Sequence, residues 1–153
     1  MNVYIITHGE KDKGVNPRLT EAGKTAITNL SVPNGITQVI VGTGRRFADV
    51  FTNIKDRVGN VPVKYSPLCG SADSGEKSET GFEVILADGT IVNVSDYLGL
   101  VGTPGVDLVA WLESLPNGTL LCAGREFLKG IGYEDGVPGR LYHYNGAEVT
   151  QIG

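Results

Sequence analysis

Short apolar runs that stop at small or polar residues recur along this chain. The run Val3 to Ile6 is rich in β-branched and aromatic residues and is short enough to form one buried strand. Similar runs cover Thr37 to Val41, Val61 to Tyr65 and Thr119 to Cys122. We expect each of them to be a strand of one sheet.

Between these runs, apolar residues recur at helical spacing. Thr20 is a good N-cap for a helix that continues to about Leu30, because its hydroxyl can accept a backbone N–H. Further helices are predicted from Arg45 to Ile54 and from Val106 to Leu115, and Arg125 to Lys129 starts another helical turn. This alternation of strands and helices is typical of a parallel sheet with crossover helices.

Other segments depart from that alternation. Residues 70–80 are small, polar and aperiodic, which predicts a mobile surface loop. Two β-hairpins are predicted around Asp88-Gly89 and Asn145-Gly146. Their strands are Phe82 to Leu86 with Thr90 to Val94, and Arg140 to Tyr144 with Glu148 to Ile152. The sequence therefore predicts an α/β fold, a three-layer α/β/α sandwich with a mostly parallel central sheet plus β-hairpin insertions, as a single domain over residues 1–153.

Composition narrows the possible partners. Of 153 residues, 41% are hydrophobic and 20% are charged, enough to bury a core. The net charge of −4 argues against a general nucleic-acid binder, which needs a basic surface. Cys69 and Cys122 form neither a disulfide framework nor a zinc pattern, so we expect reduced, buried thiols and no metal or other cofactor. No apolar run approaches the ~20 residues of a membrane span and no signal peptide is visible, which favours a cytoplasmic protein without membrane partners.

Three predicted strands end at chemically suggestive positions: His8, Gly42 and Ala123. If these strands are parallel neighbours, their carboxyl ends meet at one edge of the sheet, where open α/β sheets place their chemistry. The pair Arg45-Arg46 and Arg125 follow two of these ends. A histidine among guanidinium groups suits phosphoryl capture, because arginine forks bind phosphate oxygens while an imidazole nitrogen can attack phosphorus.

Three motifs extend this interpretation. They are Thr7-His8-Gly9-Glu10, Leu19-Thr20-Glu21-Ala22-Gly23 and Arg45-Arg46-Phe47-Ala48. In order and spacing the chain resembles the histidine phosphatase superfamily, the fold of phosphoglycerate mutase and of small phosphohistidine phosphatases. The resembling motifs there are Arg-His-Gly-Glu, Leu-Thr-x-x-Gly and a Ser-Pro-Leu-x-Arg-Ala run.

The resemblance implies specific roles. His8 would be the nucleophile that becomes phosphorylated, and Arg46 would hold the phosphoryl group. The general acid is expected after Ser66-Pro67, among Asp73, Glu76 and Glu79, of which Glu79 stands in our predicted catalytic set. The predicted substrate-binding set comprises Thr7, Gly9, Arg45, Gly124 and Arg125. The ligand would be a phosphorylated small molecule or a phosphoprotein.

The chain also departs from the superfamily pattern. Thr7 replaces the arginine before the nucleophile, and Ala123-Gly124 replaces a second His-Gly pair. A charge-assisted hydrogen bond contributes about 1.5–3 kcal/mol, so two lost donors would slow the reaction about a hundred- to ten-thousandfold. Arg125, Arg45 or the Thr7 hydroxyl could compensate.

Two functions therefore stay open. One is a phosphomonoesterase that works through phospho-His8. The alternative is a catalytically inactive module that keeps the fold and binds a phosphorylated ligand or a protein. The other histidine, His143, falls in the C-terminal hairpin and is expected to be an ordinary strand residue. A third alternative is a generic α/β domain whose resemblance to the superfamily is accidental. It is the least favoured, because the first two motifs occur together in the expected order and spacing.

Overall fold

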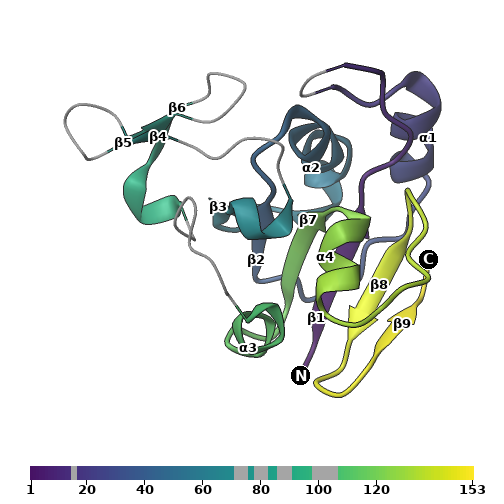
Figure 1. The fold of residues 1–153 in the computed structure, drawn as a ribbon, viewed down its shortest axis with the longest axis vertical. Coiled ribbons are helices and arrows are strands. Elements are labelled where there is room, and N and C mark those ends of the chain that lie inside the picture. Colours follow the sequence, from purple (N-terminus) through teal and green to yellow (C-terminus); the bar gives the residue numbers. More distant parts are fainter. Residues whose placement is uncertain (15–16, 71–75, 78–82, 86–90, 98–106) are drawn as a thin grey trace.

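A six-stranded sheet forms the centre of the fold. The structure is a computed structural model, which describes residues 1–14, 17–70, 76–77, 83–85, 91–97 and 107–153. The strand order of the sheet is β3-β2-β7-β1-β8-β9 (Figure 1). The strands are β1 (Val3–Thr7), β2 (Gln38–Val41), β3 (Val63–Tyr65), β7 (Thr119–Ala123), β8 (Leu141–Tyr144) and β9 (Val149–Gln151).

The strands β3, β2, β7 and β1 run parallel, and β8 and β9 add an antiparallel hairpin. Thr7 of β1 lies opposite Ala123 of β7, and Val41 of β2 lies opposite Cys122. The carboxyl ends of β1, β7 and β2 therefore meet at one edge of the sheet. This confirms the predicted meeting of the three strand ends.

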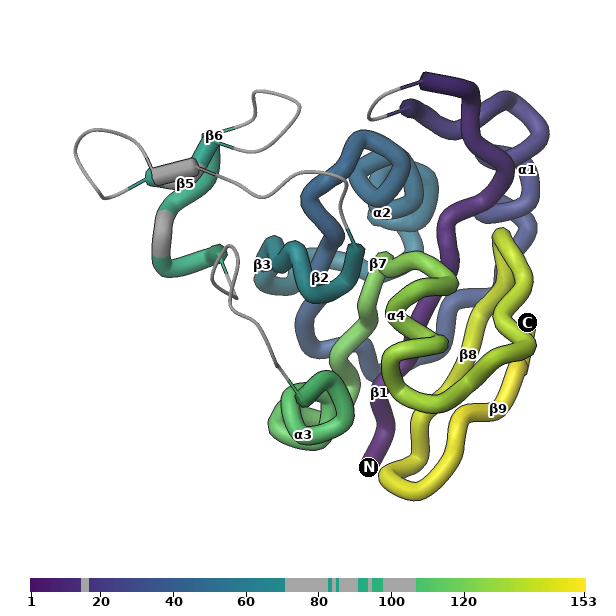
Figure 2. Tube along the Cα trace, in the orientation of Figure 1, coloured from purple at the N-terminus to yellow at the C-terminus, as the bar shows by residue number. Residues whose placement is uncertain are grey.

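Helices cover both faces of this sheet (Figure 2). They are α1 (Glu21–Thr28), α2 (Arg45–Val58), α3 (Leu108–Glu113) and α4 (Arg125–Gly130). One apolar cluster joins Ile27 of α1 and Val50 of α2 to Ile6 of the sheet. A second cluster joins Leu112 of α3 and Leu128 of α4 to its other face. The predicted three-layer α/β/α sandwich is confirmed.

A second, three-stranded antiparallel sheet is made by β4 (Glu76–Lys77), β5 (Glu83–Ile85) and β6 (Ile91–Asn93). The pairing of β5 with β6 confirms the first predicted hairpin, whose turn at residues 88–89 lies outside the described residues. The strand β4 was not expected, and the prediction of an irregular loop is wrong at these two residues. A Glu-Lys strand pairs through its backbone and leaves no apolar alternation to read.

Helix boundaries differ from the predicted ones for local reasons. α2 continues past its predicted end at Ile54 to Val58. Three charged residues, 55–57, interrupt the apolar spacing, but Val58 packs against the core again and the added turn lies against α1. There Arg57 donates to the carbonyl of Ile27 at 3.3 Å. Gly59, with a φ of 88°, ends α2, as glycines in the left-handed region commonly do. The predicted start of α3, Val106, lies outside the described residues.

Both cysteines are free and fully buried, as predicted. Burial raises the pKa of the Cys69 thiol and of the Cys122 thiol well above the ordinary value. Since the thiolate is the reactive form, these thiols are inert core residues.

The first turn of α1 packs directly on the backbone that follows β1. Thr20 caps α1, as predicted, by accepting the N–H of Gly23 at 3.1 Å, and its own N–H donates to the Glu10 carbonyl at 2.9 Å. A Cβ atom on Gly23 would lie 2.2 Å from the Glu10 oxygen, and one on Gly9 would lie 2.6 Å from the Gly23 oxygen. The first two sequence motifs are therefore in contact, and glycine is required on both sides.

We expect Gly23→Ala to destabilise the fold, although alanine is favoured over glycine by about 1 kcal/mol inside helices. The added methyl overlaps backbone, and overpacking of this kind costs about 1–3 kcal/mol. Thr25→Ala, at an exposed position of the same helix, is the matched control and should change the free energy of unfolding by less than about 0.5 kcal/mol. Thermal and urea unfolding measure both. An equal or higher melting temperature for Gly23→Ala would contradict the close contact.

Candidate functional site

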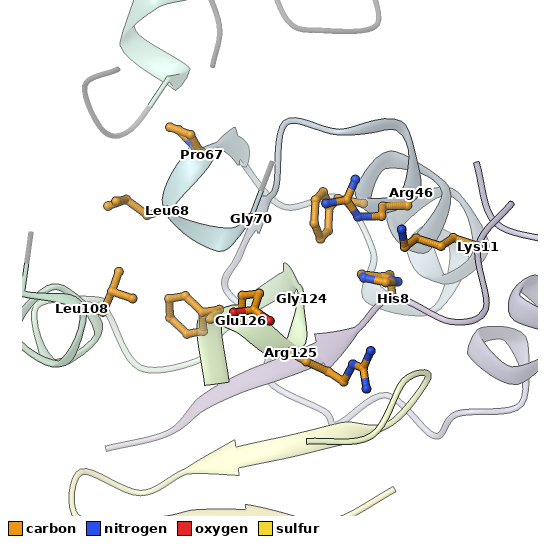
Figure 3. Close-up of a pocket in the computed structure, with 12 residues that line it drawn as sticks. His8, Lys11, Arg46, Pro67, Leu68, Gly70, Leu108, Gly124, Arg125 and Glu126 are labelled. Carbon is orange, nitrogen blue, oxygen red and sulfur yellow. The ribbon is translucent and has the colours of Figure 1, made fainter. Parts of the chain in front are cut away.

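A pocket of about 490 Å³ opens at the carboxyl ends of β1 and β7 (Figure 3). His8 follows β1, Arg46 comes from the first turn of α2, and Gly124 and Arg125 follow β7. In Figure 3 the nitrogen ends of Lys11, Arg46 and Arg125 gather around the His8 ring. The sequence therefore predicted the place of this pocket and four of the residues that line it.

Backbone contacts fix the position of His8. Its N–H donates to the Ala123 carbonyl at 3.1 Å, and its own carbonyl accepts the N–H of Gly139 at 3.0 Å. Nδ1 lies 2.9 Å from the Gly9 carbonyl oxygen. A carbonyl can only accept, so Nδ1 must carry the proton, and the lone pair of the neutral ring is on Nε2. His8 thus has the tautomer that a nucleophilic Nε2 requires.

The surroundings of His8 favour its neutral form. Burial lowers the pKa of His8, and the positive charges of Arg46, Lys11 and Arg125 lower it further. The hydrogen bond to Gly9 acts in the opposite direction but does not reverse the shift. A neutral imidazole near neutral pH follows, and this is the form that can attack phosphorus.

Phe47 supports both His8 and Arg46. The Arg46 guanidinium carbon lies 4.4 Å from the centre of the Phe47 ring, and the His8 ring meets Phe47 edge-on at 5.6 Å. A Cβ on Gly42 or on Gly70 would lie within 2.7 Å of the Phe47 ring, so the ring is closely confined. Phe47 belongs to the third sequence motif, but the motif did not predict this supporting role.

The Arg46 guanidinium lines the pocket and takes part in none of the ion pairs formed by the described residues. Its Nε atom is buried and has no hydrogen-bond partner among the described residues. Burial lowers the pKa of Arg46, yet an arginine remains charged at all physiological pH values. A desolvated, incompletely paired guanidinium is a strong site for an anion.

Lys11 is a cation of the pocket that sequence reasoning missed. It lies in the loop after β1, which a single bridge between Lys11 and Leu19 closes. Asp49 of α2 anchors that loop by accepting the Leu19 N–H at 3.1 Å and a bond from Arg18 at 2.9 Å. The sequence feature that could have indicated Lys11 as a pocket residue is its position three residues after His8.

Three predicted binding residues do not line the pocket. Thr7 is fully buried; its hydroxyl donates to the Val137 carbonyl at 2.7 Å and accepts the Arg140 N–H at 3.0 Å. This corrects the expectation that the Thr7 hydroxyl replaces a lost donor. Gly9 acts through its carbonyl on His8, and the exposed Arg45 lies outside the pocket lining.

The predicted acids are not placed at the site by the described residues. Asp73 and Glu79 lie outside them, and nothing is described of the Glu76 side chain. Glu126, in the first turn of α4, is the carboxylate that lines the described part of the pocket. It was not predicted, because its exposed helix position carries no distinguishing pattern.

His143 lies on β8, away from the pocket lining. It stacks on Tyr4 at 5.1 Å and bonds Asn2 through Nε2 at 2.8 Å, which confirms an ordinary strand role. Among the described residues, no three His, Cys, Asp or Glu side chains come together in a group able to hold a metal ion. In the same part of the chain, no helix has the length and apolar character to cross a membrane.

Solved structures share this architecture. Phosphoglycerate mutase from Thermus thermophilus superposes with a TM-score of 0.61 at 14% identity, covering 100% of this chain and 99% of that chain. The protein TTHB049 from Thermus thermophilus gives 0.60 at 12% identity, with coverages of 100% and 99%. No protein-family model and no curated protein sequence matches the chain. Identity this low speaks for the fold alone, and the chain has the phosphoglycerate mutase-like α/β fold that its motifs implied.

Proposed function

We propose that the chain binds a phosphate monoester in the pocket and hydrolyses it through a phospho-His8 intermediate. The observation that carries this proposal is a neutral imidazole with its lone pair on Nε2, surrounded by the three cations Lys11, Arg46 and Arg125. A phosphomonoester dianion complements that charge.

The proposed reaction has two displacements. Nε2 of His8 attacks phosphorus, the P–O bond to the alcohol breaks, and the alcohol leaves with a proton from a general acid. Water then attacks the phosphoryl group on His8, releases inorganic phosphate and restores the imidazole. Lys11, Arg46 and Arg125 would neutralise the phosphoryl oxygens throughout, which is where most of the rate enhancement arises.

Two cations stand in for the groups that the chain lacks. Lys11 reaches the pocket from the loop after β1, so it supplies a positive charge that Thr7 cannot. Arg125 reaches it from the turn after β7, where Ala123 offers no polar side chain. Both residues are exposed, so water screens their charges more than that of a buried guanidinium, and they are weaker substitutes.

The alternative is a module that binds phosphorylated ligands without turnover. The hydrogen bonds of the Thr7 hydroxyl to Val137 and Arg140 favour this alternative. They give a structural role to the position at which the resembling enzymes have an arginine. Binding and hydrolysis can be measured separately, so the two functions are distinguishable.

Orthovanadate should bind the wild type and raise its melting temperature, because a ligand that binds only the folded state stabilises it. We expect Arg46→Ala to weaken this binding at least about tenfold through loss of charge-assisted hydrogen bonds. Arg45→Ala removes the same charge from the adjacent, exposed residue and should leave the affinity within about twofold. Equal losses in both variants would contradict the assignment of Arg46.

Hydrolysis of an aryl phosphate should depend on His8, and rapid acid-free quenching should trap phosphate on that residue. We expect His8→Ala to lose turnover completely while still binding orthovanadate. Turnover that survives His8→Ala would remove the phospho-His8 intermediate. Orthovanadate binding without any turnover in the wild type would establish the inactive binding module instead.

The pKa of His8 should lie below the ordinary value of about 6.5, because burial and neighbouring cations disfavour the imidazolium. Since the neutral ring is the nucleophile, activity should persist below pH ~6.5 and fall as the pH drops through the lowered pKa. Lys11→Ala removes one cation, so we expect the pKa to rise and the acid limb to move to higher pH. NMR titration of the imidazole protons measures this, with His143→Asn to assign the signals.

Lys13→Ala is the matched control, because Lys13 is an exposed lysine of the same loop outside the pocket lining. It should leave the His8 titration unchanged. An equal shift of the His8 pKa in both variants would mean that any lysine of this loop has the same effect. It would contradict the placement of the Lys11 ammonium in the pocket.

The general acid is testable through leaving groups. Glu126 is the candidate from the pocket lining, and Asp73, Glu76 and Glu79 are those that the resemblance implies, of which Glu79 stands in our predicted catalytic set. Replacing the acid with glutamine should slow alkyl phosphates far more than 4-nitrophenyl phosphate, whose leaving group needs no proton. We expect this signature from one of the variants Glu126→Gln and Glu79→Gln; a uniform effect on both substrates would exclude the residue concerned.

A further inference from the structure

The pocket has two chemically different ends. His8 and the three cations make one end, and Pro67, Leu68 and Leu108 lie at the other, on the side of the view away from Arg46 (Figure 3). Phe127 also lines the pocket and belongs to the apolar cluster against which Leu108 packs. Its volume of about 490 Å³ lies in the range of small-molecule sites, roughly 300–1,000 Å³. A phosphoryl group at the cationic end would leave the apolar end for the rest of the ligand.

The apolar end is built from fixed elements. Leu68 lies on the short 3-10 helix η1 (Pro67–Cys69), where its N–H donates to the Ser66 hydroxyl at 3.1 Å. The Cys69 carbonyl accepts the N–H of Gly124 at 3.1 Å, which ties η1 to the end of β7. Phe127 is 2% exposed and meets Trp111 edge-on at 6.1 Å. This apolar wall is therefore an extension of the hydrophobic core into the pocket.

Charge distinguishes the two ends further. Glu126 lies between them in Figure 3, and its carboxylate is 3.4 Å from the Lys129 ammonium. Among the described lining residues, every cation belongs to the His8 end. A second anionic group on the ligand would meet Glu126 and apolar carbon rather than a counter-charge. The described lining thus disfavours a phosphorylated hydroxy acid.

We propose that the alcohol part of the substrate is apolar, namely an aryl or arylalkyl group that packs against Leu68, Leu108 and Phe127. This inference rests on the proposed function, because the phosphoryl group must occupy the His8 end for the alcohol to reach this wall. Burying an aromatic ring there should strengthen binding about ten- to a hundredfold over a ligand without one.

Three phosphonates that cannot be hydrolysed test the inference by calorimetry, at a mildly alkaline pH where the phosphonate groups are dianions. Methylphosphonate carries only a methyl group on phosphorus, benzylphosphonate carries an aromatic substituent and phosphonoacetate carries an anionic carboxylate substituent. We expect benzylphosphonate to bind at least about tenfold more tightly than methylphosphonate, and phosphonoacetate to bind no more tightly than methylphosphonate.

Leu108→Ala should reduce the benzylphosphonate affinity severalfold and leave that of methylphosphonate unchanged. Val109→Ala, at the next position of α3 and outside this pocket lining, is the matched control and should change neither. Leu68→Ala replaces Leu108→Ala if the latter does not fold, as judged by circular dichroism.

The outcomes separate the two proposals. Equal binding of methylphosphonate and benzylphosphonate, or tightest binding of phosphonoacetate, would overturn the apolar substrate class and leave the phosphate site intact. No binding of any phosphonate or of orthovanadate would overturn the proposed function itself. Loss of benzylphosphonate affinity in Val109→Ala as large as in Leu108→Ala would overturn the assignment of the wall.

Discussion

The contact between the backbones of Gly9 and Gly23 is the constraint on which the site depends. With no Cβ on either side, the first turn of α1 rests on the chain immediately after β1. This contact fixes the segment that holds the His8 ring through the Gly9 carbonyl and that continues into the loop carrying Lys11. Two motifs that residues 11–18 separate in sequence are thus a single structural unit, and the orientation of the imidazole is a consequence of backbone packing.

Phe47 gives the site its second property, a guanidinium available for binding. Arg46 lies over an aromatic ring, and none of the ion pairs formed by the described residues involves it. A carboxylate partner would have positioned the arginine equally well but would have neutralised it. The ring positions the charge without cancelling it, and its edge supports His8 as well. Tight packing of Phe47 against glycine backbones is therefore directly relevant to the proposed anion binding.

The sequence predicted those parts of the molecule that follow from periodicity and topology. Apolar runs identified the strands of the central sheet, and parallel neighbours then brought His8, Arg46 and Arg125 to one edge. Lys11 could not be predicted, because an exposed lysine in a polar loop has no pattern and its place depends on the anchoring of that loop by Asp49. The fate of the Thr7 hydroxyl depends on Val137, which lies 130 residues away. Tertiary contacts of this range leave no trace in local sequence.

The burial of Thr7 also bears on how such a protein can change over evolutionary time. Its hydroxyl joins the end of the first strand to the segment that leads into the C-terminal hairpin, so it serves as a structural joint. A single mutation to arginine would force a guanidinium into a fully enclosed space and break two hydrogen bonds at once. Acceptance of an arginine at this position would require a coordinated change in residues 137–140. A more strongly cationic site would evolve more easily through substitutions in the loop after β1, because the exposed Lys11 can be replaced without disturbing the core.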